Sequence, residues 1–540
     1  MKRFFGLFSK ENSIRGASII LIITLALSNI LGLLRDRFLT KNILTSDLDT
    51  YYASFRIPDL IFNFLILGAI TSAFIPVFSE YVMGKKLKEG YKITNSLINI
   101  ALVVLIIVAL IFILIMPQIM PLVVPKFDAV RMAEAVKYSR LLMLTPIFFS
   151  TSYILGGVLN SFKRFLAYSL APIIYNLSII IGAAFFASRY GVIAVVYSVI
   201  IGSILHLLVQ IPPALKLGFR FSTVFDWRDK AIKKIIRLMI PRTIGMGANQ
   251  LMLIVYTAIA SSLAVGSIAA FTLSNNIQTM PSVVFGTSFA TAIFPTLTAK
   301  IALNDKTSFA FYLNRTLRSI AFLLIPSSVI FILLRAQIVR LILGSGKFDW
   351  DDTKRTALTL GLFSISLLAQ GLIPLLARAF YALKNTRTPM YISIVTAVIS
   401  VVLGFPLAKM FGVAGLALAF SIASFINVGI LFFYLRRIYP EIWNKGVSFS
   451  YIRITTISLI MGALVWYAMH IVANYVDMDR YWGILSQTCI ALVVGAVSYL
   501  GLSRFFDSDE MNWALTRKIN GESSEVSTVE SMEEAEYEKV

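Results

Sequence analysis

The chain has 540 residues, of which 58% are hydrophobic and 14% are charged, and its mean hydropathy is +0.80. This composition excludes an ordinary soluble globular domain and is typical of a polytopic membrane protein. The net charge of +21 does not indicate a nucleic-acid partner, because the cations are spread over many short segments instead of forming one dense stripe.

Apolar segments of about 20 residues, long enough to cross a hydrocarbon core about 30 Å thick as helices, recur along the chain. They lack the alternation of roughly ten-residue barrel strands, so we predict an all-α polytopic membrane protein with about 14 transmembrane helices. The predicted spans are residues 16–38, 50–82, 91–117, 135–160, 165–187, 191–213, 231–263, 266–296, 309–334, 357–383, 388–409, 412–435, 449–473 and 481–504.

Lysine and arginine concentrate in alternate loops between these spans. The loops after the second, fourth and sixth spans are rich in cations at residues 85–92, 163–164 and 216–234. The intervening loops are poorer, and the richest of them, residues 335–356, also contains aspartates. Under the positive-inside rule this asymmetry predicts a multi-pass protein with both termini in the cytoplasm.

Three pairs of short motifs recur at an offset of about 220 residues, which indicates an internal duplication. The pairs are Ser72–Ser79 with Thr291–Thr298, Phe162–Lys163 with Leu383–Lys384, and Tyr190–Val192 with Phe411–Val413. Six spans per copy make the copies parallel, as in transporters that bind substrate between two lobes near the bilayer midplane.

The duplication and the composition together divide the chain. We predict a basic cytoplasmic N-terminus at 1–15, an N-lobe at 16–225, a C-lobe at 226–440, two further spans at 441–505, and an acidic, disordered cytoplasmic tail at 506–540.

Charged residues interrupt the first two apolar segments at Arg35, Asp36, Asp49, Arg56 and Asp59. A charge at that depth costs at least about 2.5 to 3.5 kcal/mol, so we expect these side chains to face a water-filled interior. A guanidinium group makes paired hydrogen bonds to phosphate oxygens, so the two arginines are predicted to converge on an anionic, diphosphate-like group.

The alternative for cations near helix ends is snorkelling to the interface. We assign that role to Arg37 and Lys41. For Arg378 in the tenth span, snorkelling and substrate contact both stay open.

Later spans add polar residues to the predicted cavity. These are Arg242 after a proline in the seventh span and Asn275 and Asn276 in the eighth. For the neighbouring amides Asn249, Gln250 and Gln278, interhelical hydrogen bonding is the alternative. Four prolines are predicted to kink helices during movement of the lobes: Pro58, Pro76, Pro281 and Pro295.

Catalytic signatures are absent from the sequence. It has no Walker motif, no HExxH and no Gly-x-Ser-x-Gly, one cysteine (Cys489), and two histidines in apolar runs. We therefore predict a non-enzyme without a cofactor or a metal site.

The runs Gly32–Asp36, Asp49–Asp59, Gly68–Tyr81 and Arg378–Pro389 resemble the MurJ/MviN lipid II flippase family of the MOP exporter superfamily. The resemblance implies two six-helix lobes plus two helices. It also implies export of lipid II, the undecaprenyl-diphosphate-linked disaccharide-pentapeptide, across a bacterial cytoplasmic (inner) membrane for peptidoglycan synthesis. Membrane lipids and cell-wall synthesis enzymes are further candidate partners.

Three positions depart from the arginines that the resemblance implies in the cavity, namely Asn29, Phe62 and Asn276. Our hypothesis is that Arg242 or Arg378 has taken over part of the diphosphate binding. The seventh and eleventh spans also lack the carboxylates that hold sodium in some family members, so we expect membrane potential acting on a cationic cavity to reset the carrier.

We predict alternating access, with the substrate headgroup between the lobes and its polyprenyl tail in lipid. Three alternatives stay open from the sequence. One is a flippase for another polyprenyl-diphosphate oligosaccharide, such as O-antigen or capsule units, and another is a non-transporting cell-wall scaffold. The third, drug antiport, fits less well because a cationic drug requires a carboxylate-dominated cavity.

Overall fold

The computed structural model describes residues 14–64, 73–442 and 445–511. This part of the chain is built of helices and contains no strand, which confirms the predicted all-α polytopic class. Ten helical segments in it are long and apolar enough to cross a membrane, or eleven if the bent pair α18 and α19 forms one span. The three remaining predicted spans coincide with the helices that carry Arg35, Arg56 and Arg242.

The first half of the chain contains the helices of predicted spans one to six. They are α2 (Ile14–Asn42), α3 (Thr45–Ser54), α4 (Arg56–Phe62), α5 (Ile75–Met83), α6 (Leu87–Val123), α7 (Ala129–Leu142), α8 (Thr145–Ser161), α9 (Phe165–Ile181), η3 (Gly182–Phe186), α10 (Ala187–Tyr190), α11 (Val192–Leu208) and α12 (Ile211–Lys216).

The second half contains the helices of spans seven to twelve, and a final hairpin follows it. They are α13 (Lys230–Ser261), α14 (Ser267–Pro281), η4 (Ser282–Thr287), α15 (Ser288–Ala302), α16 (Lys306–Leu333), α17 (Arg335–Ile342), α18 (Trp350–Ser364), α19 (Leu367–Ala382), α20 (Arg387–Phe411), α21 (Val413–Ile438), η5 (Pro440–Ile442), α22 (Lys445–Ala473) and α23 (Tyr481–Phe505).

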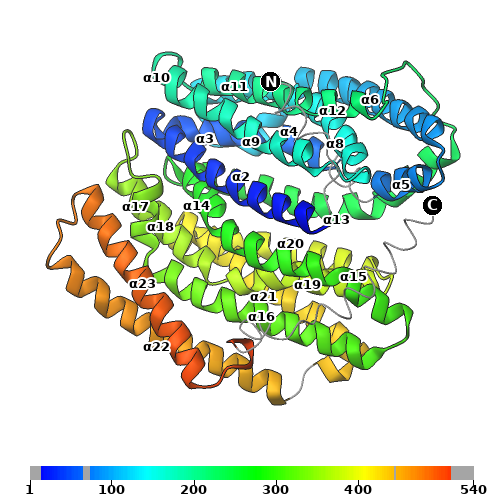
Figure 1. Ribbon diagram of the computed structural model, residues 1–540. Helices are drawn as coiled ribbons and strands as arrows, with labels where there is room; N and C mark the ends of the chain where they lie inside the picture. Colours follow the sequence, from blue (N-terminus) through cyan, green and yellow to red (C-terminus); the bar gives the residue numbers. More distant parts are fainter. Residues whose placement is uncertain (1–13, 65–72, 443–444, 512–540) are drawn as a thin grey trace.

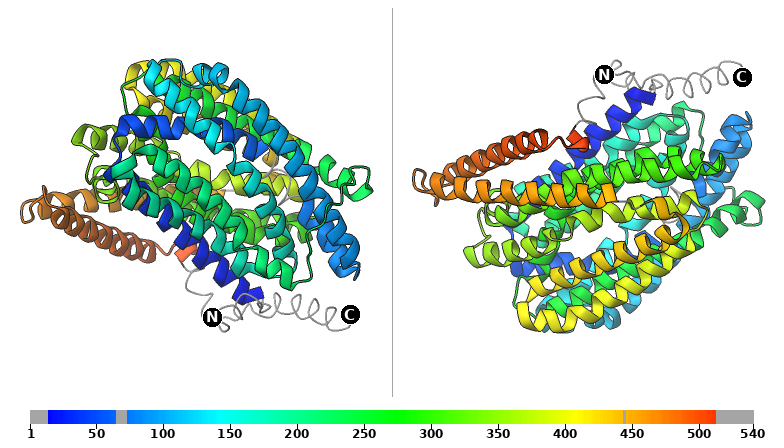
Figure 2. Two further views of the ribbon diagram at one scale, coloured as in Figure 1. Left: turned by 90° about the horizontal axis from the view of Figure 1, so that it is seen from above. Right: turned by 90° about the horizontal axis from the view of Figure 1, so that it is seen from below.

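The two halves lie beside each other as separate bundles (Figure 1). In the first half α9 packs on α2 and α11, and in the second α20 packs on α13 and α21. The α22–α23 hairpin packs on α16 and stands out from the side of the second bundle in Figure 2. Contacts between the halves run through α3 with α14, α4 and α6 with α13, and α2 with both α14 and α17.

The internal repeat is also present in the backbone. The φ angle is positive at Lys163 (55°) and at Lys384 (58°). It is also positive at Gly191 (67°) and at Gly412 (61°). Each pair is separated by about 220 residues, which is the offset of the sequence motifs. Left-handed backbone is uncommon outside glycine, so its recurrence at matching helix ends supports a true duplication.

Glycine permits one close crossing inside the second half. Gly286 of η4 lies against Gly371 of α19, and a Cβ atom added to Gly286 would overlap with the backbone of Gly371. Backbone cannot move aside as a flexible side chain can, so this contact fixes the approach of η4 to α19.

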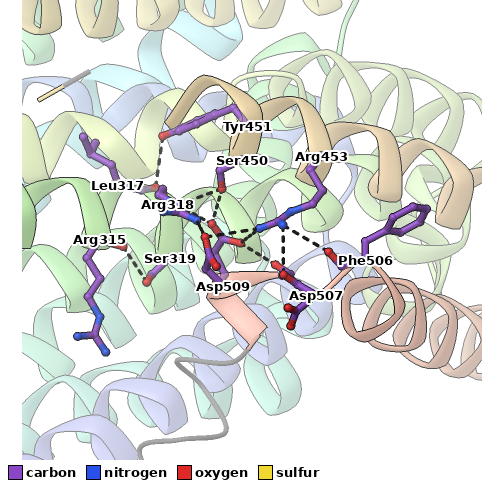
Figure 3. A network of polar contacts seen from close by, with 12 residues as sticks. Arg315, Leu317, Arg318, Ser319, Ser450, Tyr451, Arg453, Phe506, Asp507 and Asp509 are labelled. Carbon is purple, nitrogen blue, oxygen red and sulfur yellow. Dashed lines mark hydrogen bonds and ion pairs between the residues drawn. The ribbon is translucent and has the colours of Figure 1, made fainter. Parts of the chain in front are cut away.

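The end of the described chain is bound to the protein. The tail that the sequence predicts to be disordered begins at residue 506. In the structure residues 506–511 instead fold back onto α16 and α22 (Figure 3). Arg318 of α16 donates from Nε to Glu510 Oε1 at 2.6 Å, and Arg453 of α22 donates from Nη2 to Glu510 Oε2 at 3.1 Å. The rest of the predicted tail, residues 512–540, lies outside the described residues.

Glu510 remains ionised in this cluster, which we name the C-terminal clasp (Arg318, Ser450, Arg453, Asp509 and Glu510). Burial alone would raise its pKa, but hydrogen bonds from Ser450 and Ser508 and the charge of Arg318 lower the pKa of Glu510 to about 2. Two guanidinium groups therefore hold one buried carboxylate, and this fastens the α22–α23 hairpin to α16.

Replacing Gly286 with alanine is expected to destabilise the protein by about 1 to 3 kcal/mol, because the added methyl group overpacks a backbone contact. Thermal unfolding of the purified protein in detergent measures this. Gly429→Ala in α21 is the matched control, since a Cβ there meets nothing within 4 Å. Equal stability of the two variants would contradict the assigned crossing.

Glu510→Gln is expected to weaken attachment of the hairpin by about 1 to 3 kcal/mol, because charge-assisted bonds are lost. A folded-state pKa below the usual 4.5 means that this stabilisation is complete above about pH 4.5 and disappears as pH falls toward 2. Limited proteolysis at the α23 end from pH 7 to pH 2, with Glu441→Gln as control, tests both statements. A variant that is cleaved no faster than the control at pH 7 would disprove the clasp.

Candidate functional site

The two halves are tied together at one end of the molecule, which we name the closed end. Here the connections α2–α3, α13–α14 and α17–α18 meet. Asp49 of α3 accepts hydrogen bonds from the backbone N–H groups of Gly266, at 2.6 Å, and Ala269, at 2.7 Å. A carboxylate placed at the N-terminal end of α14 satisfies free N–H groups and interacts favourably with the helix dipole.

Gly266 has a φ of 87°, a left-handed backbone conformation that glycine adopts more readily than other residues. Next to it, Thr45 of the first half donates to the two carboxylate oxygens of Asp352 in the second half, at 3.1 and 3.0 Å. Arg355 completes the tie by donating to the carbonyl of Val265. The closed end is therefore held by polar contacts contributed from three separate connections.

Apolar side chains from both halves bury beneath these ties. Leu39 and Ile43 of the first half share a core with Val339 and Leu343 of the second half, all of them at most 2% exposed. Thr40 adds a hydrogen bond to the carbonyl of Leu343 at 3.1 Å. Water is thereby excluded from this end of the boundary between the halves.

The expectation that Arg37 only snorkels is wrong, whereas the same expectation for the exposed Lys41 side chain is not tested by its backbone contact. Arg37 donates to the carbonyl oxygens of Leu341 and Ile342 at the C-terminal end of α17, at 2.5 and 3.3 Å. The carbonyl of Lys41 accepts from the backbone N–H of Lys347 at 3.2 Å. A cation at a helix C-terminus satisfies free carbonyls, and spacing along α2 alone does not reveal that partner.

A charged cluster lies one helical turn further into the boundary. Asp36 of α2 is fully buried and accepts from Arg35 Nη2 at 2.9 Å and from Asn276 Nδ2 of α14 at 2.8 Å. Arg35 also donates from Nη1 to Asn176 Oδ1 of α9 at 3.3 Å. Arg35, Asp36 and Asn276 are thus brought together, with one carboxylate joining the two halves.

Arg56 crosses the same boundary from α4. Its Nε donates to the Thr257 hydroxyl of α13 at 2.6 Å, and its Nη2 donates to the Thr272 hydroxyl of α14 at 3.3 Å. The side chain is buried, at 8% exposure, and among the described residues no carboxylate lies within 4.0 Å of it. Neutral hydroxyls do not balance the charge of a buried guanidinium, and Asp59 attracts it only from beyond ion-pair distance, which favours a closer anion.

Asn29 is the predicted position with an unsatisfied group. It lies on α2 seven residues before Asp36, and its buried Nδ2 has no hydrogen-bond partner among the described residues. Two helical turns place Asn29 and Asp36 on similar faces of α2. Asn275 instead accepts from Gln278 within α14 at 3.1 Å. Gln278 also exchanges hydrogen bonds with Gln370 of α19, at 3.2 and 2.9 Å, which is the interhelical alternative for this amide.

Arg378 belongs to a different place from the first two arginines. It lines a cavity of about 990 Å³ inside the second half, together with Arg237, Asn249 and Gln370. Among the described residues that line this cavity there are two arginines and no carboxylate. The Arg242 prediction is untested, because its side chain lies outside the described residues.

The four prolines occupy different helix positions. Pro58 is near the start of α4 and Pro76 near the start of α5, where proline is tolerated. Pro281 ends α14 at the π-helix η4, and Pro295 lies inside α15. The sharp bend of 45° between α18 and α19 was not among the predicted kinks, and it lies ahead of Pro374 in α19.

Known proteins match nearly the whole chain. A family model described as "Lipid II flippase MurJ" matches residues 44–485. A probable lipid II flippase MurJ of Buchnera aphidicola is 28% identical over 482 residues, covering 88% of this chain and 94% of the relative. A lipid II flippase MurJ of Burkholderia cenocepacia is 26% identical over 461 residues, covering 82% and 88%.

Solved structures show the same fold. One is titled "Lipid II flippase MurJ, inward closed conformation", with a TM-score of 0.73 at 24% identity, covering 91% of this chain and 99% of that one. An inward-facing multidrug resistance MATE family transporter of the MOP superfamily has a TM-score of 0.65 at 13% identity, covering 77% and 95%. The predicted MOP-like architecture is therefore confirmed.

The double variant Thr45→Cys with Asp352→Cys, in a Cys489→Ala background, is expected to form a disulfide under mild oxidation. The reason is that the native side chains are hydrogen-bonded to each other across the closed end. Adding Asp49→Asn should lower the yield severalfold by weakening the tie to α14. The shift of the oxidised band on a non-reducing gel measures the yield. A Thr45–Asp477 cysteine pair is the control, and an equal yield from it would contradict the closed end.

Proposed function

The chain belongs to the MurJ family of lipid II flippases, and from that membership we propose that it carries lipid II from the cytoplasmic to the outer leaflet by alternating access. The protein is a multi-pass membrane transporter and not an enzyme. The family match does not favour the alternatives of an O-antigen or capsule flippase or of a non-transporting scaffold.

One observation carries the proposed binding site. Arg56 holds a buried positive charge at the boundary between the halves, and only threonine hydroxyls contact it among the described residues. A diphosphate group offers the charge that these hydroxyls lack, and Arg35 lies on the same boundary with Asp36 orienting it. Asn29 and Asn276 are then available as neutral donors to sugar or phosphate oxygens.

The direction of opening follows from loop charge. The positive-inside rule assigns the closed end to the outer face and both termini to the cytoplasm. On this assignment the described conformation is closed toward the outside. At the opposite end α5 packs on α6 and α8, and α15 packs on α16 and α19. The halves also touch there, because Lys234 of α13 donates to Glu80 of α5 at 2.8 Å, an exposed ion pair that opening toward the cytoplasm has to break.

Substrate charge provides the differential contact that a conformational change requires. In the described conformation Asp36 bonds to Asn276 and Arg56 bonds to Thr272, so two groups of the first half are tied to α14 of the second. A diphosphate that takes over the arginines competes with these ties and shifts the balance toward the conformation with an open outer face. The lobes at 16–225 and 226–440 are the proposed moving bodies.

The cavity charge also suggests what resets the carrier. The second-half cavity is cationic, because Arg237 and Arg378 line it with no carboxylate among the described lining residues, so membrane potential draws the empty carrier back toward the cytoplasm. The cytoplasmic (inner) membrane is the proposed location. Cell-wall synthesis enzymes remain predicted partners.

The double variant Arg35→Ala with Arg56→Ala is expected to slow lipid II flipping at least about tenfold, because two charge-assisted contacts to the diphosphate are lost. The measurement is the rate at which lipid II becomes accessible on the far leaflet of reconstituted vesicles. Arg480→Ala is the matched control, since that side chain is 81% exposed and pairs only with Asp477 at 3.0 Å.

A double variant that keeps folding and flips lipid II at the unmodified rate would overturn this site. A charge-retaining double lysine variant separates geometry from charge. Lysine keeps the positive charge but loses the planar fork, so an intermediate rate is expected.

A further inference from the structure

A small aromatic cage lies inside the first half and has no part in the proposed diphosphate site. It is a cavity of about 200 Å³ lined by Phe55, Pro58, Asp59, Phe62, Thr145, Phe149, Tyr153, Pro172, Tyr175 and His206. The rings pack around it as a continuous wall. Phe62 lies 5.3 Å from Phe149 and 5.5 Å from Tyr153 between ring centroids, and Phe149 lies 5.4 Å from Tyr175.

Asp59 is the acidic member of this cage. Arg56, one helical turn before it on α4, directs its Nε and Nη2 toward Thr257 and Thr272 of the second half. Among the described residues no Lys, Arg or His nitrogen forms an ion pair with the Asp59 carboxylate within 4.0 Å. Arg56 attracts the Asp59 carboxylate only from beyond ion-pair distance, so no described cation makes a direct ion pair with this carboxylate in its apolar cavity.

His206, another polar residue lining the cage, already has a hydrogen-bond partner. His206 is held by the Ser152 hydroxyl, whose oxygen lies 2.7 Å from His206 Nδ1. Gln210 donates to the same hydroxyl at 2.7 Å. His206 thus closes the cage as a fixed ring, stacked on Tyr153 at 5.6 Å, and Asp59 is left as its charged group.

The cage borders the charged cluster at the boundary between the halves. Tyr175 of the cage precedes Asn176, which accepts a hydrogen bond from Arg35. Asp59 follows Arg56 on the same short helix. One ligand can therefore reach both the arginines and the cage, provided that it carries a negative and a positive group close together.

We propose that this cage binds an aliphatic ammonium group of the transported substrate, such as the side-chain amine of a diamino acid in its peptide. A carboxylate surrounded by aromatic faces attracts an ammonium ion by charge and by cation–π contact, and the walls exclude competing water. The volume suits one alkylammonium side chain and is too small for a sugar ring with its substituents.

Phe62 contributes to the selectivity of the cage. Its ring forms the wall at the position where the family resemblance implies an arginine. A cation there would repel an ammonium ion, whereas a ring face attracts it. The chain thus combines fewer cavity arginines with an added site for a cation, and the proposal rests on lipid II being the substrate.

The test compares two forms of lipid II in vesicles that contain the full chain. One form carries a free side-chain amine in its peptide, and in the other that amine is acetylated. The unmodified protein is expected to flip the free-amine form about tenfold faster at limiting concentration. Asp59→Asn should remove this preference by slowing only the free-amine form, and Phe62→Leu should reduce it without removing the carboxylate.

Asp351→Asn is the matched control, because that carboxylate is 78% exposed and pairs with Lys354 at 2.9 Å. It should leave the preference unchanged. Equal flipping of the two lipid forms by the unmodified protein overturns the proposal, as does an Asp59→Asn variant that slows both forms equally.

A direct binding measurement separates the cage from the proposed transport. Calorimetry with n-butylammonium should detect binding that Asp59→Asn weakens about tenfold while Asp351→Asn does not. If neither lipid is flipped but this binding is present, the proposed function fails and the cage stands as an ammonium site. If butylammonium binds but acetylation of lipid II has no effect, the cage takes free amines and the substrate assignment is overturned.

Discussion

The structure depends on how it accommodates ionised groups at membrane depth. Each such group needs a partner, and the first half obtains these partners largely from the second. Asp49 takes backbone amides of α14, Asp36 takes Asn276, and Arg56 takes two threonine hydroxyls. The charges that make the first two spans unusual are therefore also the contacts that join the two bundles.

This arrangement explains why binding and movement are coupled. A side chain that hydrogen-bonds across the boundary between the halves cannot bind an anionic substrate with the same donor groups at the same time. Substrate binding and the contacts between the halves therefore compete for the same donors. Arg56 is in this position, and Arg35 is linked to the same boundary through Asp36, which accepts from both Arg35 and Asn276. The ties of Asp49, Thr45 and Asp352 lie instead at the closed end. The residues of the proposed diphosphate site and those of the closed end are consequently adjacent but distinct.

The final hairpin is attached at both ends to the second bundle. Near one end Gln337 of α17 donates to Gln487 of α23 at 3.0 Å, and at the other the C-terminal clasp binds Glu510 to Arg318 and Arg453. Two fixed points on neighbouring helices make the hairpin a part of the second bundle during any relative movement of the halves.

Hydropathy and motif offset were sufficient to predict the all-α membrane class, most of the spans and the internal repeat, because both are local properties of the chain. The sequence also identified Arg35, Asp36, Asp49 and Arg56 as interior groups, since the cost of placing charge in lipid does not depend on the fold. The fold alone decided their partners. Asn276, Gly266 and Thr257 lie more than 200 residues away from the groups that they contact, and no local pattern pairs them.

The same limit applies to the roles of Arg37, Glu510 and Asp59. Arg37 resembles an ordinary snorkelling cation until α17 is placed beside it, and Glu510 resembles the acidic tail until α16 and α22 supply two arginines. Asp59 becomes a candidate ammonium ligand only because α8, α9 and α11 bring aromatic rings around it. Burial and charge compensation arise from surroundings in three dimensions, so they belong to the tertiary structure.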